Sequence, residues 1–185
     1  MRGLTIAGLV WLMAACATSS TPPASVDTKL DVNWTLQGRI ALKSGEQNLS
    51  GQLQWLRQSG HDELLLASPL GQGVARIMRD TDGVVLEIPN EPPRRAPDAE
   101  SLTHDVLGYP LPLSGLAYWI QARPDPGRPY KQTSDATGRL SQLKQDGWVI
   151  DYLQYLPDQP ARPRKLVVSR EDIEIRLVVD TWRAE

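Results

Sequence analysis

Trp34-Thr-Leu-Gln-Gly-Arg-Ile-Ala-Leu-Lys43 alternates apolar and polar side chains, and this alternation decides the fold. Successive side chains of a strand point to opposite faces, so Trp34, Leu36, Ile40 and Leu42 would share one face. Gly38 falls on that face as well. A strand with one apolar and one polar face is typical of an antiparallel sheet that has a core on one side and water on the other.

The same alternation recurs along the chain, interrupted by Gly, Pro, Asn and Asp. A turn at Ser44-Gly45-Glu46 would join the first strand to the second in a meander. Further strands are predicted over Leu49–Trp55, Glu63–Ala67, Gly73–Arg79, Val84–Ile88, Leu140–Gln145, Trp148–Tyr155, Lys165–Ser169 and Ile173–Val179. Strands at such regular spacing indicate a sandwich or a barrel.

Two short helices are predicted between these strands. Asp98 is the candidate N-cap of the first, and Gly108 follows its end. Pro112 lies early in the second, which is very apolar and should stop before Arg123-Pro124. A curved sheet would otherwise expose its concave face, so the helices most simply cover or plug it. The expected fold is therefore mainly β with short helices, in which the helical pair forms a lid or plug on a curved antiparallel sheet.

Cys16 is the single cysteine, and it ends an apolar run from Leu4 to Met13 that is followed by two alanines. This layout resembles a bacterial lipoprotein signal, which implies cleavage before Cys16, a diacylglyceryl group on its sulfur and acylation of its new amino terminus. The alternative is an ordinary cleaved signal that leaves a free cysteine. Ala17, where inner-membrane lipoproteins typically carry aspartate, points to the outer membrane.

The expected organisation has three parts. Residues 1–15 form the signal peptide, residues 16–33 the lipidated amino terminus with a flexible tether, and residues 34–185 one folded domain. The tether is inferred because residues 17–33 are rich in Ser, Thr and Pro and lack a core-forming pattern.

Aromatic residues are unusual here, since six tryptophans accompany no phenylalanine. They either fill the core or line an incompletely filled interior that accepts an apolar ligand. Sequence patterns leave both readings open. Candidate cavity residues, chosen because they lie on apolar sides of strands or helices, are Trp34, Leu36, Ile40, Leu53, Trp55, Leu86, Leu116, Trp119, Trp148, Ile150 and Tyr152.

Several segments occur together in the order and spacing of the LolB family of outer-membrane lipoproteins. They include Trp34–Ala41, the Trp55 strand, Leu64–Gly71, Leu107–Leu113 with Trp119, Gln145–Trp148 with Tyr152, and Trp182. The resemblance implies an unclosed barrel with a helical lid around a hydrophobic cavity. It also implies a monomeric, periplasm-facing receptor that takes triacylated lipoproteins from a periplasmic LolA-like carrier and inserts them into the lipid of the outer membrane.

Ser68-Pro69-Leu70-Gly71 is predicted to be a tight turn, with Pro69 at its second position and Gly71 able to take a positive φ. Leu70 at such a tip is either tucked back onto the sheet or exposed. In the LolB family the protruding-loop leucine inserts lipoproteins into the membrane, and the resemblance gives that role to Leu70.

Other classes of function find little support. A formal net charge of −2 without a basic stripe argues against nucleic acid. His61 and His104 have no second histidine or cysteine at metal-ligand spacing, so no metal site is expected. No nucleophile elbow or phosphate loop is present, so neither an enzyme nor a cofactor is expected. The remaining alternative is an anchored lipid-binding or envelope-scaffolding lipoprotein without insertion activity.

Overall fold

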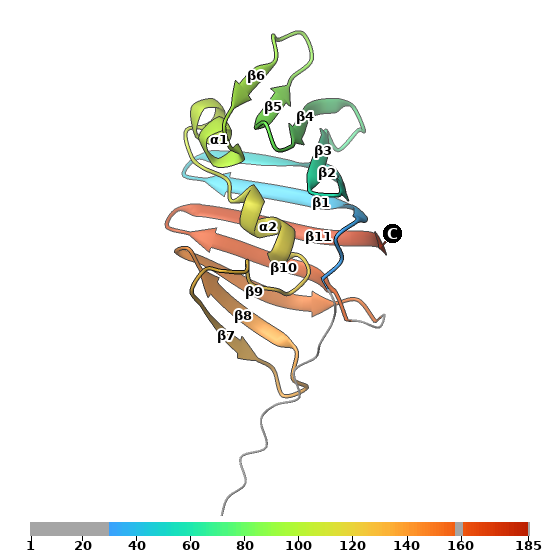
Figure 1. Ribbon diagram of the computed structural model, residues 1–185, viewed down its shortest axis with the longest axis vertical. Coiled ribbons are helices and arrows are strands. Elements are labelled where there is room, and N and C mark those ends of the chain that lie inside the picture. The colour runs from blue at the N-terminus through green and yellow to red at the C-terminus, as the bar shows by residue number, and fades with distance from the viewer. Residues whose placement is uncertain (1–29, 158–160, 185) are drawn as a thin grey trace, which may run out of the picture.

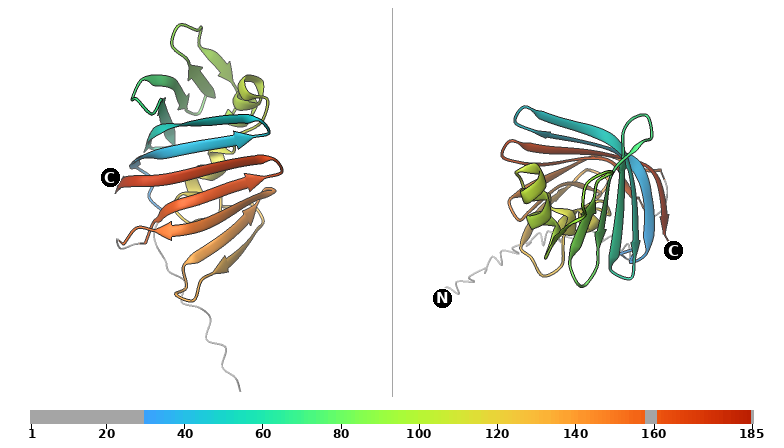
Figure 2. Two further views of the ribbon diagram at one scale, coloured as in Figure 1. Left: turned by 180° about the vertical axis from the view of Figure 1, so that it is seen from behind. Right: turned by 90° about the horizontal axis from the view of Figure 1, so that it is seen from above.

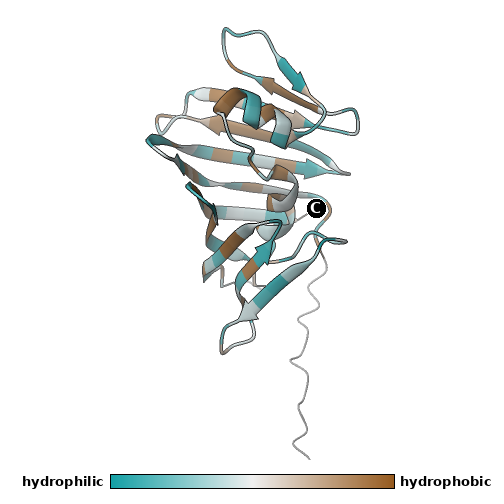
Figure 3. Ribbon diagram, turned by 90° about the vertical axis from the view of Figure 1, so that its left-hand side faces the viewer, coloured by the Kyte–Doolittle hydropathy of each residue, from teal (hydrophilic) through white to brown (hydrophobic). Residues whose placement is uncertain are grey.

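One antiparallel sheet dominates the computed structural model, which describes residues 30–157 and 161–184 (Figure 1). Its strands alternate apolar and polar residues along their length (Figure 3). The elements are β1 (Trp34–Ser44), β2 (Gln47–Gln58), β3 (His61–Ala67), β4 (Gly73–Arg79), β5 (Val84–Glu87), β6 (Arg94–Ala96), α1 (Ala99–Leu107), α2 (Leu113–Trp119), β7 (Tyr130–Ser134), β8 (Leu140–Gln145), β9 (Trp148–Tyr155), β10 (Pro163–Arg170) and β11 (Ile173–Ala184).

The strand order is β6-β5-β4-β3-β2-β1-β11-β10-β9-β8-β7. The first strand therefore pairs with the last in the middle of the sheet, while β6 and β7 form its two free edges. The segment between them, which carries both helices, crosses from one edge to the other over the concave face (Figures 1 and 2). The result is the expected unclosed barrel with a helical lid.

Two glycines allow the long central strands to bend. A Cβ on Gly38 would lie 2.2 Å from the backbone oxygen of Val178, next to a register shift between Gln37 and Gly38. A Cβ on Gly51 would lie 2.3 Å from the backbone oxygen of Ala67. Any side chain at these positions would push neighbouring strands apart, so glycine is what lets the sheet curl around the helices.

The predicted ends of α1 are confirmed. The Asp98 carboxylate accepts a hydrogen bond of 2.6 Å from the backbone N–H of Ser101, as an N-cap should. This hydrogen bond holds the pKa of Asp98 below its ordinary value. Gly108 ends the helix with a φ of 85°, and its N–H donates to the oxygen of His104. Helix α2 ends at Trp119, before Arg123-Pro124 as expected.

All nine predicted strands are present, with ends that differ by a few residues, and the hairpin between β1 and β2 turns at Gly45 and Glu46. The sequence analysis did not predict two further strands, β6 and β7. Every residue of β7 is exposed, and β6 has three residues, so neither carries an apolar alternation. Within the described residues, neither helix has the length and apolar character needed to cross a bilayer.

Candidate functional site

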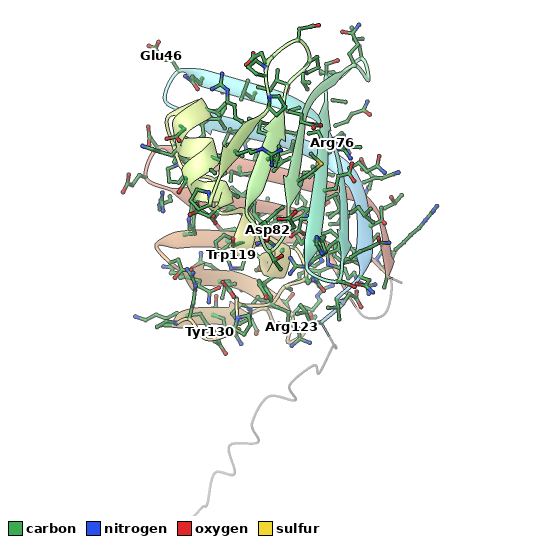
Figure 4. The ribbon with its side chains drawn as sticks, turned by 45° about the horizontal axis from the view of Figure 1, so that its top comes forward. Glu46, Arg76, Asp82, Trp119, Arg123 and Tyr130 are labelled. Carbon is green, nitrogen blue, oxygen red and sulfur yellow. The ribbon has the colours of Figure 1, made fainter. Side chains whose placement is uncertain are left out.

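The candidate site is the concave face of the sheet together with the helices that cover it. Helix α2 buries most of its surface there, through Leu113, Gly115, Leu116, Ala117 and Trp119. All of these except Gly115 belong to one hydrophobic cluster, which runs across the sheet from β5 to β8. Figure 4 shows Trp119 within the curve of the sheet, beside the ribbon of α2. Sheet and lid therefore share a single apolar core.

Aromatic rings occupy this core where the folded domain begins. The ring of Trp34 stacks on Trp182 with centroids 4.7 Å apart and meets Trp55 edge-on at 5.1 Å. Asp31 lies just before this cluster, in the range predicted to be tether. Its backbone N–H donates to Gln121, and its carboxylate accepts from the indole of Trp182 and pairs with Arg162. The chain is therefore fixed to the domain from Asp31 onward.

A buried amide holds the carboxyl end of α2. The Gln145 side-chain oxygen accepts from the indole N–H of Trp119 at 2.9 Å, and from the backbone N–H of Asp125 at 2.8 Å. The Tyr152 hydroxyl donates to the backbone oxygen of Trp119 at 3.0 Å. Burial raises the pKa of Tyr152 well above its ordinary value, so this hydroxyl keeps its proton and its role as donor.

A buried carboxylate holds the amino end of α2, and sequence reasoning missed it. Asp62 is 4% exposed and accepts from the Trp55 indole at 2.9 Å and from the guanidinium groups of Arg57 and Arg79. Arg79 also donates to the hydroxyl of Ser114 in α2 at 3.3 Å. The group therefore links three strands to the lid.

The signal for this cluster was present in the strand pattern. In the observed register Arg57 pairs with Asp62, and Asp62 pairs with Arg79. Each charge lies two residues from an inward-facing Trp55, Leu64 or Ile77, so all three point inward by alternation. Three charges of mixed sign in phase with a buried face predict an internal ion-pair network.

Ten of the eleven candidate cavity residues are buried, and Ile40 is half-buried against the same core. In this conformation they contact one another and the lid helices. A groove of about 830 Å³ lies elsewhere and includes only Leu53 of the eleven. Its lining centres on polar residues of the outer face, such as Gln37, Arg39, Gln52 and Gln54, so it is a different feature from the predicted cavity.

Arg39 belongs to this outer face, which it shares with Gln37 and Lys43 by the alternation of β1. Its guanidinium is exposed and forms an ion pair of 3.0 Å with Asp180, which raises the pKa of Arg39. An exposed pair of this kind contributes little to stability.

The Ser68–Gly71 turn takes the predicted form and presents Leu70 to solvent. The Gly71 N–H donates to the Ser68 oxygen at 2.8 Å, and Gly71 has a φ of 84°. The Ser68 N–H donates a hydrogen bond of 2.7 Å to the backbone oxygen of Gln72, which closes the loop. Leu70 is 90% exposed, more than any other large apolar side chain of the described residues. Of the two alternatives for Leu70, the exposed one is confirmed.

Some expectations concern residues or chemistry outside this arrangement. Cys16 and the signal peptide lie outside the described residues. His61 and His104 are both exposed. Among residues 30–157 and 161–184, no group of three or more histidine, cysteine or acidic side chains is arranged to hold a metal ion.

An open, strongly curved antiparallel sheet wrapped around a short helical cover defines the class of fold to which this chain belongs. A crystal structure of a LolA superfamily protein from Nitrosomonas europaea aligns with 85% of this chain and 88% of its own, with a TM-score of 0.54 and 9% identity. At that identity the likeness concerns the fold alone.

Sequence comparison identifies the family. The model of the outer membrane lipoprotein LolB matches residues 32–182. An outer-membrane lipoprotein LolB of Thiobacillus denitrificans is 54% identical over 100% of this chain and 99% of its own. One from Azoarcus sp. is 39% identical over 92% and 89%. The chain belongs to the LolB family of outer-membrane lipoproteins. Family and fold together support a role in lipoprotein localisation, and LolB is not a known enzyme family.

Proposed function

We propose that this protein accepts lipoproteins from a periplasmic LolA-like carrier, encloses their acyl chains between the concave sheet and the α1–α2 lid, and inserts them into the outer membrane. Lipidation of Cys16 would anchor it, and residues 16–30 would tether the domain on the periplasmic side as a monomer. The observation that carries this proposal is the continuous apolar core shared by the sheet and a cover made of two short helices.

The magnitude of the hydrophobic effect explains why such a shelter is needed. The acyl chains of a lipoprotein hold about 40 methylenes, and exposing them to water costs about 30 kcal/mol at roughly 0.8 kcal/mol each. Exchange between two apolar interiors avoids this cost, so transfer needs neither ATP nor another energy source. In the closed conformation the candidate lining residues contact one another, so uptake requires the lid to move away from the sheet.

Leu70 supplies the second half of the proposal. Its side chain is held at the tip of a hydrogen-bonded turn, so it can enter a bilayer without unfolding of the loop. Burying one leucine in lipid contributes roughly 1.5 to 3 kcal/mol, which suits transient docking and is too little for permanent anchoring. Pro69 and Gly71 act here by fixing the turn.

The decisive experiment replaces Leu70 by glutamate. A carrier loaded with a labelled lipoprotein is mixed with the variant, and transfer from carrier to variant is measured separately from transfer to liposomes. We expect acceptance to be unchanged and delivery to liposomes to fall roughly tenfold or more, because glutamate cannot contribute the leucine's burial energy.

A matched control is Leu153→Glu, since Leu153 is 53% exposed on β9, far along the sheet order from the turn. This control should deliver as the unaltered protein does. If delivery by Leu70→Glu stays at the control level, the insertion role is wrong. The alternative of an anchored lipid-binding or scaffolding lipoprotein would then be favoured.

A further inference from the structure

The indole N–H groups of three tryptophans each have a dedicated acceptor. Trp55 donates to Asp62 at 2.9 Å, Trp119 donates to Gln145 at 2.9 Å, and Trp182 donates to Asp31 at 3.3 Å. Each acceptor is a side chain that also binds other groups. The fold therefore provides polar partners for indoles that lie in or beside the core, as buried N–H donors require.

Trp34 differs, because it is completely buried and its indole N–H has no acceptor within the part of the chain that the structure describes. Its ring is packed against Trp55 and Trp182, and Leu36 follows on the same face of β1. A buried donor without an acceptor destabilises the folded protein. An orphaned donor in an apolar surrounding is a group that an incoming acceptor can satisfy.

The chemistry of this position selects the acceptor. The site offers one donor, so a ligand group that brings only an acceptor matches it, and a group that also brings its own N–H would leave that N–H unpaired. A fatty ester meets this condition, since its carbonyl oxygen accepts and it has no donor. It is also uncharged, so its burial among tryptophan and leucine costs less than burial of a phosphate or carboxylate.

We propose that the indole N–H of Trp34 donates a hydrogen bond to an ester carbonyl of the diacylglyceryl group carried by a bound lipoprotein. This inference rests on the proposed function, since it assumes that acyl chains enter beneath the lid. Through this hydrogen bond the site recognises the ester linkage of the acyl chains in addition to their hydrocarbon.

The test compares two synthetic lipopeptides with one peptide sequence, one with ester-linked glyceryl chains and the other with ether-linked chains of equal length. The full chain is processed, purified and placed in nanodiscs, and the affinity for each probe is measured by fluorescence. We expect the ester probe to bind roughly three- to tenfold more tightly, which is the range of one net hydrogen bond. In Trp34→Phe the affinity for the ester probe should fall to that for the ether probe.

Trp182→Phe is the matched control, because the indole N–H it removes already has an acceptor in Asp31. This variant should keep the preference for the ester. A second readout does not need either variant to fold: the indole ¹H–¹⁵N resonance of Trp34 in the unaltered protein should shift on binding the ester probe and not the ether probe.

Equal affinity for the two probes, or a preference that persists in Trp34→Phe, overturns the role of Trp34 and indicates that water satisfies its N–H. In both cases binding of the two probes leaves the proposed function standing. Failure of the unaltered protein to bind either probe overturns the two proposals together.

Discussion

Asp62 shows at the residue scale how a single carboxylate joins sheet and lid. Its oxygens are the shared acceptor for two guanidinium groups and one indole, and Arg79 extends the connection to Ser114 of α2. Removing one member of a buried ion-pair network strongly destabilises the folded protein, because the charged groups that remain are still desolvated but have lost their partner. The carboxylate therefore stabilises this corner of the core as a unit.

Replacing Asp62 by asparagine should lower the free energy of unfolding by about 3 kcal/mol, because two arginines then lack a counter-charge. Urea denaturation measures the change. Asp180→Asn breaks an ion pair that is largely exposed and should leave the free energy of unfolding almost unchanged. Equal losses in the two variants would contradict the interpretation of Asp62 as the centre of a buried network.

At the scale of the element, the curl of the sheet depends on β1 lacking a side chain at Gly38. Gly38→Ala places a methyl group against the backbone of β11, which cannot move aside as a flexible side chain could. We expect a loss of about 1–3 kcal/mol in the free energy of unfolding, as for overpacked cores. Gly73→Ala is the control, since a Cβ there meets open space and no positive φ opposes it. Comparable stability of both variants in urea would show that the bend does not need glycine.

The hairpin of β7 and β8 has its own pH dependence. In its turn, the Asp135 carboxylate accepts from the hydroxyl and the N–H of Thr137 and from the N–H of Arg139, which lowers the pKa of Asp135 to about 2. Because the pKa of Asp135 in the folded protein is below the ordinary 3.8, the ionised carboxylate stabilises the folded state, and this contribution is complete at pH values above 3.8. It is lost as the pH falls from about 4 toward 2.

An NMR titration of the Asp135 carboxyl carbon tests this behaviour. Thr137→Val should raise the pKa of Asp135 toward 3.8, because the hydroxyl donor is the largest cause of the shift. Thr137→Ser retains that donor and should leave the pKa low. A pKa near 3.8 in the unaltered protein would refute the assignment.

Across the whole molecule, sequence patterns predicted the elements whose residues are half-buried. The alternation around Trp34 and Trp55 predicted that these segments are strands and which of their side chains face the core. Asp98 and Gly108 predicted the two ends of α1. Strand β7 could not be found in this way, because Tyr130–Ser134 is exposed throughout and owes its conformation to pairing with β8. Alternation along each strand placed Arg57, Asp62 and Arg79 on the inner face, but which of these charges pair with one another depended on the register between three strands.

For the candidate site, too, the sequence predicted which residues are buried but not how they would surround a ligand. Burial of ten of the eleven candidate residues, and partial burial of Ile40, followed from their periodicity, because alternation separates inside from outside. Which of them surround a ligand depends on how the lid moves relative to the sheet, and periodicity holds no information about that movement. Exposure of Leu70 was an open alternative, since a tight turn accommodates an apolar tip in either orientation.

The pairing of β1 with β11 also has a consequence for biogenesis. Synthesis delivers β1 before all the other described strands and β11 after them, so the central seam cannot close until β11 has left the ribosome and the secretion channel. Until then an edge bearing Trp34 and Leu36 stays without its neighbour, and such edges invite self-association. Closure between sequence-distant partners is also slow. Newly exported molecules should therefore depend on holding factors in the envelope for longer than a domain built from local hairpins would.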